Sequence, residues 1–150
     1  LEGKTRLEVL QAQFQQAVER LPETTHFGLV IYNERFEVWQ PKLVPATSGN
    51  KFAAVQALYG QQATGKTALF DALEAGLSFE GGAEQVILLT DGQPTAGKLV
   101  DTPSIIAAVH KLNQWTRTRI DCFGIDTEGP PEELLKAIAA DNYGTYIRLR

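Results

Sequence analysis

The stretch EQVILLTDG, residues 84–92, decides the fold class of this chain. Its consecutive apolar residues at 86–89 are typical of a strand that is buried on both faces of a parallel sheet. Asp91 and Gly92 follow directly and are typical of the turn that ends such a strand. Because open α/β sheets bind ligands at the carboxyl ends of their strands, the sequence places Asp91 at the edge where a ligand would bind.

Helix and strand patterns alternate on both sides of this strand. Before it, the apolar residues of 4–21 recur every three or four positions, as on an amphipathic helix, and 26–40 is predicted to be a β-hairpin. The other predicted elements are helices at 51–59, 67–77, 102–115 and 129–141, and strands at 119–126 and 144–150. This order predicts an α/β fold: one Rossmann-like, three-layer α-β-α domain over residues 1–150, with a mostly parallel sheet and one antiparallel edge strand.

Two of the predicted helices allow side chains to be assigned to a face. The apolar stripe of the first helix consists of Leu7, Leu10, Phe14, Val18 and Leu21. In the helix at 102–115, Thr102 is the predicted cap and Pro103 the first helical residue. The residues of this helix that are predicted to face inward are Ile105, Ile106, Val109 and Leu112.

The composition of the 150-residue chain is ordinary for a globular domain, with 43% apolar and 21% charged residues. The net charge is −4 and no cluster of lysine and arginine stands out, which argues against a nucleic-acid partner or an anionic membrane surface. The apolar runs are far too short to form a membrane segment. Cys122 is the single cysteine, so the chain has no internal disulfide or cysteine-based zinc site, and we expect a small buried thiol.

Residues 60–67, GQQATGKT, fit the phosphate-binding pattern G-x-x-x-x-G-K-[ST]. Such a loop needs a buried strand directly before it, whereas the residues at 51–59 have helical spacing and good helix formers. Asp91, at the end of an apolar strand, is the one feature that would suit a magnesium-binding aspartate of an NTPase. A P-loop NTPase that uses Lys66, Thr67 and Asp91 is therefore kept as an alternative; otherwise Lys66 is expected to be solvated.

Several segments, in the correct order, resemble the von Willebrand factor A domain over nearly the whole chain. HFGLVIYNERFEV (26–38) is similar to the second and third strands of that family, and TGKTALFDAL (64–73) to its loop-helix segment, usually written G-G-T-x-L-x-D-A-L. VILLTDGQPT (86–95) is similar to its metal-site strand, and residues 119–149 to its final strand, acidic loop, helix and strand. The lysine at 66 replaces the usual second glycine and so creates the phosphate-loop pattern by coincidence.

This resemblance implies a protein-binding module without enzymatic activity, and a metal-ion-dependent adhesion site at the carboxyl edge of the sheet. By their positions in the matching segments, Thr67 and Asp91 would be metal ligands. Hard oxygen ligands suit Mg²⁺ or another divalent cation, which keeps some of its waters. Because a hydroxyl and one carboxylate bring little charge, the ion would stay electrophilic, and an acidic side chain of a protein partner could complete its shell.

The chain departs from the family in one segment, the D-x-S-x-S loop that follows the first strand. No such pattern is present, and the serines (Ser48, Ser78 and Ser104) do not follow an apolar strand in that way. Because the chain starts at Leu1, we expect this central first strand, missing here, to belong to a longer parent rather than to have been lost. The 150 residues alone are then expected to bind Mg²⁺ weakly or not at all, and a metal-free scaffold is a further alternative.

In the family this first strand lies between the strands predicted at 26–32 and 84–90. Without it, both neighbours would have an edge of unpaired backbone N–H and C=O groups. They would stand about 9–10 Å apart, twice the normal spacing, if they keep their places. Alternatively, they would close up or accept a strand from another chain.

The other polar residues give weaker signals. Asp71 lies four residues after Thr67 and is expected to be a surface or supporting carboxylate rather than a ligand, and Asp126 is expected to be a solvated acid at the end of a neighbouring strand. Thr67 itself could instead be a helix N-cap. His26 and His110 are isolated, with no zinc or catalytic pattern around them. No nucleophile and base are paired, so the sequence makes no case for catalysis.

Overall fold

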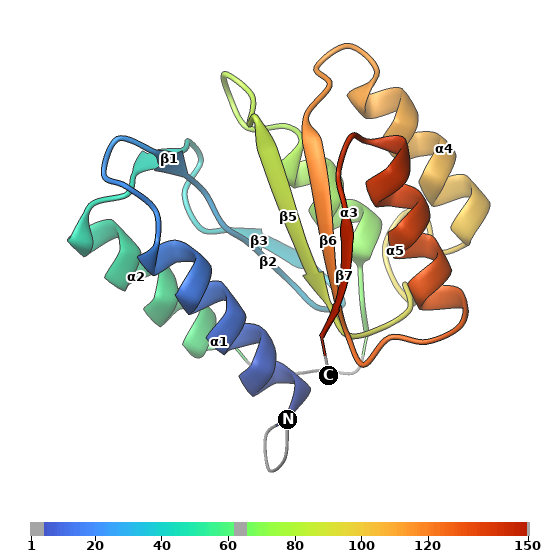
Figure 1. Ribbon diagram of the computed structural model, residues 1–150, viewed down its shortest axis with the longest axis horizontal. Helices are drawn as coiled ribbons and strands as arrows, with labels where there is room; N and C mark the ends of the chain where they lie inside the picture. Colours follow the sequence, from blue (N-terminus) through green and yellow to red (C-terminus); the bar gives the residue numbers. More distant parts are fainter. Residues whose placement is uncertain (1–4, 62–65, 150) are drawn as a thin grey trace.

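The computed structural model describes residues 5–61 and 66–149, and its helices and strands follow the predicted α/β order (Figure 1). Residues 5–61 form the hairpin half, whose elements are α1 (Arg6–Glu19), β1 (His26–Phe27), β2 (Val30–Tyr32), β3 (Phe36–Val38), β4 (Val44–Pro45) and α2 (Ser48–Tyr59). Residues 66–149 form the parallel half, whose elements are α3 (Leu69–Gly76), β5 (Gln85–Thr90), α4 (Thr102–Asn113), β6 (Arg119–Ile125), α5 (Pro130–Asp141) and β7 (Tyr146–Leu149).

The parallel half is built on a parallel sheet in the order β5-β6-β7. Leu88 on β5 is in register with Cys122 on β6, which is in register with Tyr146 on β7. The buried side chains of this sheet and of α3, α4 and α5 form the main core, which consists of Leu69, Phe70, Leu73, Leu88, Ile105, Val109, Ile120, Cys122, Leu134, Leu135, Ile138 and Ala139. Burial raises the pKa of the Cys122 thiol to about 12, so this is the inert buried thiol that the sequence predicts.

The hairpin half has shorter strands and a smaller core. β2 and β3 form the predicted antiparallel hairpin, and β1 pairs with β4, a two-residue strand that no sequence pattern predicts. The predicted strand at 26–32 is interrupted at Gly28, where a Cβ atom would lie 2.9 Å from both Leu43 and Phe79. Four of the buried residues of this half form a separate cluster, which consists of Val18, Phe27, Ala46 and Ala54.

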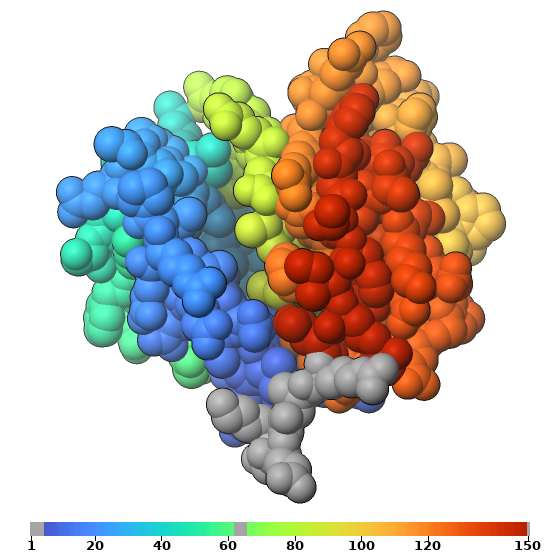
Figure 2. Space-filling model, viewed as in Figure 1, coloured from blue at the N-terminus to red at the C-terminus, as the bar shows by residue number. Residues whose placement is uncertain are grey.

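The two halves are separated by a cavity of about 1030 Å³ between β2 and β5. Within the described residues, β2 pairs with β3 and β5 pairs with β6, and no ladder joins β2 to β5, so these strands do not close up. The Tyr32 hydroxyl on β2 donates across the cavity to the Leu89 carbonyl on β5 over 3.0 Å, and the Ala68 N–H in the parallel half donates to the Asn33 carbonyl in the hairpin half over 2.6 Å. In Figure 2 the surface is hollowed between the blue α1 and the yellow-green β5.

The apolar stripe of α1 lines this cavity, although its carboxyl-terminal member Val18 is buried in the cluster of the hairpin half. Leu7, Leu10 and Phe14 are only half-buried, although their spacing is that of a core-facing stripe. The helix itself begins as the sequence predicts, because Thr5 and Glu8 form a reciprocal capping box. An apolar helix face and an open strand edge therefore enclose the same space.

Two details of α4 differ from the prediction. Asp101, and not Thr102, is the N-cap, and its carboxylate accepts a hydrogen bond from the Ser104 N–H over 3.0 Å. Leu112 does not face inward, since 39% of its surface is exposed. Val109 and Asn113 are buried on the same part of the helix, so Leu112 lies at the border of the buried face, which helical spacing alone could not reveal.

Candidate metal centre

Thr67 lies just before α3 and is bound through its backbone to the loop that follows β5. Its N–H donates to Thr95 Oγ1 over 2.9 Å, and its carbonyl accepts from the N–H groups of Thr95 (2.9 Å) and Ala96 (3.2 Å). These hydrogen bonds hold residue 67 against the loop at 91–96, which carries the second predicted ligand.

The Thr67 hydroxyl does not cap α3. This helix begins at Leu69, its N-cap residue is Ala68, and no side chain accepts a capping hydrogen bond there. Oγ1 of Thr67 instead lies beside the turn at Asp91 and Gly92, 3.9 Å from the position that a Cβ atom on Gly92 would take. The alternative interpretation of Thr67 as an N-cap is therefore wrong.

Asp91 follows β5 directly and is half-buried at the carboxyl edge of the sheet. It lines the cavity together with Thr67. Tyr32 reaches toward it from the hairpin half: burial raises the pKa of the Tyr32 hydroxyl, and the negative charge of nearby Asp91 raises that pKa further. The structure thus brings both predicted ligands to one rim of the cavity, with Tyr32 near them.

Asp71 supports the loop that carries Asp91. Its carboxylate accepts a hydrogen bond from the Lys98 N–H over 3.0 Å, and the Lys98 ammonium pairs with Glu74, also on α3, over 2.6 Å. Gly97 makes this contact possible, because its φ of 92° favours glycine and an added Cβ atom would lie 2.9 Å from the Asp71 carboxylate. Asp71 is therefore a supporting carboxylate on the surface of α3, as the sequence suggests.

Two other predicted residues lie in solvent. Asp126 is exposed beyond the end of β6, in the left-handed conformation with φ 52°. Lys66 is exposed as well. Residues 62–65 of the phosphate-loop pattern lie outside the described residues, but the segment before them is the helix α2 and not the strand that a phosphate loop requires.

The residues present suit a hard divalent cation in kind but provide few ligands. Thr67 and Asp91 supply one hydroxyl and one carboxylate, and both are oxygen ligands of the type that Mg²⁺ prefers. Across residues 5–61 and 66–149, no group of three or more His, Cys, Asp or Glu side chains is placed to hold a metal ion. A cation here would need further oxygen ligands from water or from another segment.

The sequence matches the von Willebrand factor type A domain over residues 2–147. The chain belongs to this family. Von Willebrand factor type A domains are in general interaction modules without enzymatic activity. The family resemblance and the Rossmann-like α/β fold that the sequence predicted are both confirmed.

Individual relatives agree with this assignment. The chain is 30% identical over 122 residues to the human von Willebrand factor A domain-containing protein 3A, covering 80% of this chain and 10% of that protein. It is 32% identical over 92 residues to the human inter-alpha-trypsin inhibitor heavy chain H4, covering 54% of this chain and 10% of that protein. This von Willebrand factor type A domain therefore spans about a tenth of the length of the curated relatives that it matches.

Solved structures share the fold. A von Willebrand factor type A protein from Catenulispora acidiphila is similar with a TM-score of 0.78 and 25% identity, covering 97% of this chain and 35% of that one. BatB from Bacteroides thetaiotaomicron has a TM-score of 0.69 at 16% identity, covering 98% and 81% of the two chains, which shows likeness of fold alone. None of the helices in the described part of the chain has the length and apolar character needed to cross a membrane.

Two contributors to the site were not found from the sequence. Thr95 lies inside the matching segment at 86–95, three residues after Gly92. The sequence therefore indicated that Thr95 belongs to this loop, but it did not indicate the hydrogen bond to Thr67. No sequence pattern pointed to Tyr32. Its hydrogen bond to Leu89 joins residues that are 57 positions apart, and it depends on how the two halves meet.

Proposed function

We propose that this chain is a protein-binding module in which Thr67 and Asp91 share a divalent cation, Mg²⁺ in the simplest case, and an acidic side chain of a protein partner completes the coordination shell. The observation that carries the proposal is the set of backbone hydrogen bonds between Thr67 and the loop at 91–96. A hydroxyl and a carboxylate from separate segments are thereby held at one sheet edge, where open α/β sheets bind ligands.

The coordination shell is incomplete without ligands from outside the described residues. Mg²⁺ demands a near-octahedral set of oxygens, and only two are supplied here. We propose that an extended strand seated between β2 and β5, parallel to β5, supplies the others from a loop at its carboxyl end. Three features support this proposal: the cavity, the unpaired edge of β5 and the half-buried stripe of α1. Such a strand would fill the cavity, pair with the edge of β5 and bury the stripe of α1.

Low ligand charge is the feature that would make the cation selective for acidic partners. A single carboxylate neutralises only part of the charge of Mg²⁺, so the ion keeps a strong attraction for a further anionic oxygen. A partner carboxylate can displace one of the waters that Mg²⁺ retains. The residues of this chain would hold and orient the ion, and the partner would provide the final ligand.

The experiment uses Mn²⁺ as a paramagnetic substitute for Mg²⁺, because line broadening in amide NMR spectra reports on weak binding at individual residues. We expect Mn²⁺ to broaden the amides of residues 67 and 91–92 first and excess Mg²⁺ to restore them. Asp91→Asn and Thr67→Ala should abolish this selective broadening, and Thr67→Ser should keep it. The matched control is Asp126→Asn, which removes an exposed carboxylate at the end of the neighbouring strand.

Each arm of this experiment can contradict the proposal. Broadening that is equally strong in Asp91→Asn, or that is centred on Asp126, would show that these residues do not form the site. Tight Mg²⁺ binding by the 150 residues in calorimetry would show that no further ligands are needed. Absence of any Mg²⁺-reversible broadening, even after a β-strand with a D-x-S-x-S loop is fused before residue 5, would favour a metal-free scaffold.

A further inference from the structure

The amino edge of the parallel sheet, opposite the candidate metal centre, carries an unusual set of exposed side chains. The loops at 114–118 and 142–145, together with the last turn of α4, form what we term the aromatic edge. Trp115 is 86% exposed, Tyr143 63% and Leu112 39%. Tryptophan is highly buried on average, so one that gives most of its surface to water is informative in a way that a single exposed leucine is not.

Buried asparagines hold the two loops of the aromatic edge together. The Asn113 amide donates to the Thr118 carbonyl over 2.7 Å and to Asn142 Oδ1 over 2.9 Å, while its own Oδ1 accepts from the Thr118 N–H over 2.8 Å. Asn142 in turn donates to the Ile138 carbonyl over 2.8 Å. Asn113 and Asn142 are each only 2% exposed, so this polar network is part of the core structure and fixes both loops.

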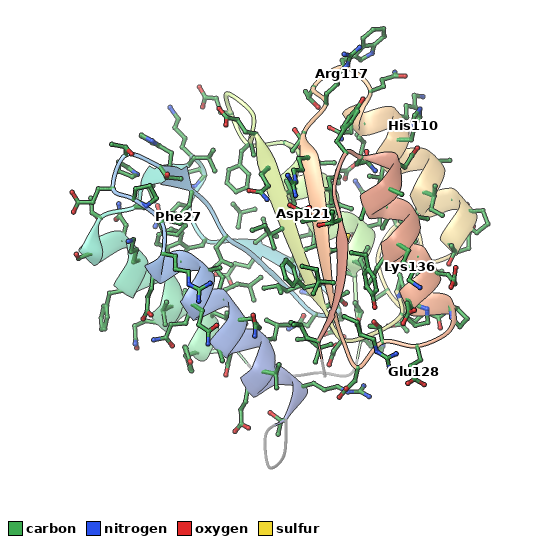
Figure 3. The ribbon with its side chains drawn as sticks, viewed as in Figure 1. Phe27, His110, Arg117, Asp121, Glu128 and Lys136 are labelled. Carbon is green, nitrogen blue, oxygen red and sulfur yellow. The ribbon has the colours of Figure 1, made fainter. Side chains whose placement is uncertain are left out.

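Two residues of the aromatic edge have a left-handed backbone conformation. Arg117 has a φ of 53° and Tyr143 a φ of 63°, both in the left-handed region that residues other than glycine rarely occupy. Figure 3 shows Arg117 at the outer end of the loop after α4, at the opposite end of the sheet from Glu128.

The charge of the aromatic edge is opposite to that of the chain. Arg117 and Lys111 make no ion pair with any residue in the described ranges. Of the nearby acids, Asp121 accepts from Arg119 and Asp141 is 3.0 Å from His110, whereas the exposed Glu84, whose backbone carbonyl accepts from the Arg119 N–H, makes no ion pair within the described ranges. Two unpaired cations in the same loops and helix turn as exposed aromatic residues, on a chain with a net charge of −4, favour an acidic ligand.

We propose that the aromatic edge is a second docking surface, which binds an acidic segment of a protein partner that also carries apolar side chains. Tryptophan, tyrosine and arginine are the residue types that most often dominate binding energy at protein interfaces. Trp115 and Tyr143 would cover the apolar side chains of the segment, while Arg117 and Lys111 would pair with its carboxylates. Because this surface lies at the other end of the strands from Thr67 and Asp91, its binding does not depend on a divalent cation.

The probe is a labelled twelve-residue peptide of alternating glutamate and leucine, added to the chain in the presence of EDTA. We expect amide shifts confined to residues 111–118 and 142–145, and affinity that falls as salt rises. Trp115→Ala and Arg117→Glu should each weaken binding at least tenfold. Phe52→Ala is the matched control, because Phe52 is 67% exposed on α2 in the hairpin half, and Lys42→Glu is the control for charge.

The outcomes separate the proposed ligand from its competitors. Equal binding of a lysine-leucine peptide, equal effects of Trp115→Ala and Phe52→Ala, or the lack of shifts at this edge would each overturn the proposal. Preferential binding of oligo-dT would replace the acidic segment with a nucleic acid. Concentration-dependent self-association that Trp115→Ala abolishes would show that a second copy of the chain is the occupant. Because Trp115 is exposed, we expect Trp115→Ala to melt at the same temperature as the parent chain. Equal melting temperatures would show that weaker peptide binding by this variant is not caused by misfolding.

Discussion

The parallel half and the hairpin half use the same kinds of residues, but only the parallel half buries them in an extended core. In the parallel half, α3, α4, α5 and the sheet share one large cluster of buried side chains. In the hairpin half, the buried cluster is limited to Val18, Phe27, Ala46 and Ala54, and β1 to β4 are strands of two or three residues. Burial of apolar area is the main source of folding free energy, so we expect the parallel half to dominate stability.

The difference in buried core between the two halves matters for function at their boundary, because the candidate ligands lie there. α3 packs against both β2 and α4, and it follows Thr67 directly in the chain. The candidate ligands thus lie in the half with the larger buried core, and the cavity beside them is lined by residues of both halves. A site of this kind can be completed or opened without disturbing the main core.

The largest difference in stability should appear when one large aliphatic side chain in each half is replaced by alanine. Ile138 on α5 is fully buried, so Ile138→Ala should lower the free energy of unfolding by about 2–5 kcal/mol. Leu10 on α1 is half-buried beside the cavity, so Leu10→Ala should cost less than about 1 kcal/mol. Urea unfolding followed by circular dichroism measures both, and equal losses would contradict the division into a strong and a weak half.

A second, smaller effect concerns the charged side chain that ties the parallel strands together. Asp121 on β6 accepts hydrogen bonds from Arg119, Gln85 and Thr145, from three strands or their ends. Burial by itself raises the pKa of this carboxyl, but the hydrogen bonds, that of the Thr145 N–H first, outweigh it and hold the pKa below its ordinary value. Asp121→Asn should therefore cost about 1–3 kcal/mol at neutral pH, because charge-assisted hydrogen bonds are lost.

The pH dependence follows from the direction of that pKa shift. Since the carboxyl is a stronger acid in the folded chain, its contribution is complete above the ordinary aspartate pKa of about 4 and is lost as the pH falls through the lower, folded value. Urea midpoints measured from pH 7 to pH 2 should decline more steeply for the parent chain than for Asp121→Asn. Parallel curves for the two proteins would show that Asp121 is not the source of this acid sensitivity.

The same contrast explains how much could be predicted from the sequence. The strand at 84–92 and the helix at 129–141 carry strong local patterns, and the structure has both within a few residues. β4 was missed because it has only two residues, and the break at Gly28 was missed because it depends on Leu43 and Phe79 approaching the backbone. Local periodicity predicts elements well where they are long, and the parallel half has the longer strands.

For the candidate site, topology was predictable and contacts were not. The rule that ligands gather at the carboxyl ends of parallel strands placed Asp91 at this edge, whereas Thr67 was expected there because of the family resemblance. The hydrogen bonds of Thr67 to Thr95, and the reach of Tyr32 across the cavity, depend on loop conformation and on the separation of the halves. That these two residues bind a metal, and that a central strand completes the sheet, stay predictions.

A third test addresses the Tyr32 hydrogen bond, one of several contacts between the halves. Tyr32→Phe removes the hydroxyl that donates to Leu89, so it should lower the free energy of unfolding by about 1 kcal/mol and speed amide exchange in the hairpin half. The matched control is Tyr59→Phe, because the Tyr59 hydroxyl donates to Gln15 at an exposed site within the hairpin half. Similar effects of the two variants would show that the Tyr32 bond does not couple the halves.

The smallest global effect is expected at the start of α1. Thr5→Ala breaks the capping box with Glu8 and should destabilise the first turns of this helix by about 1 kcal/mol. If the hairpin half unfolds locally before the parallel half does, that loss should appear in hydrogen exchange of residues 8–12 while the urea midpoint stays nearly unchanged. A drop of the urea midpoint as large as that caused by Tyr32→Phe would instead show that α1 and the parallel half unfold as one cooperative unit, so that the open cavity does not separate them energetically.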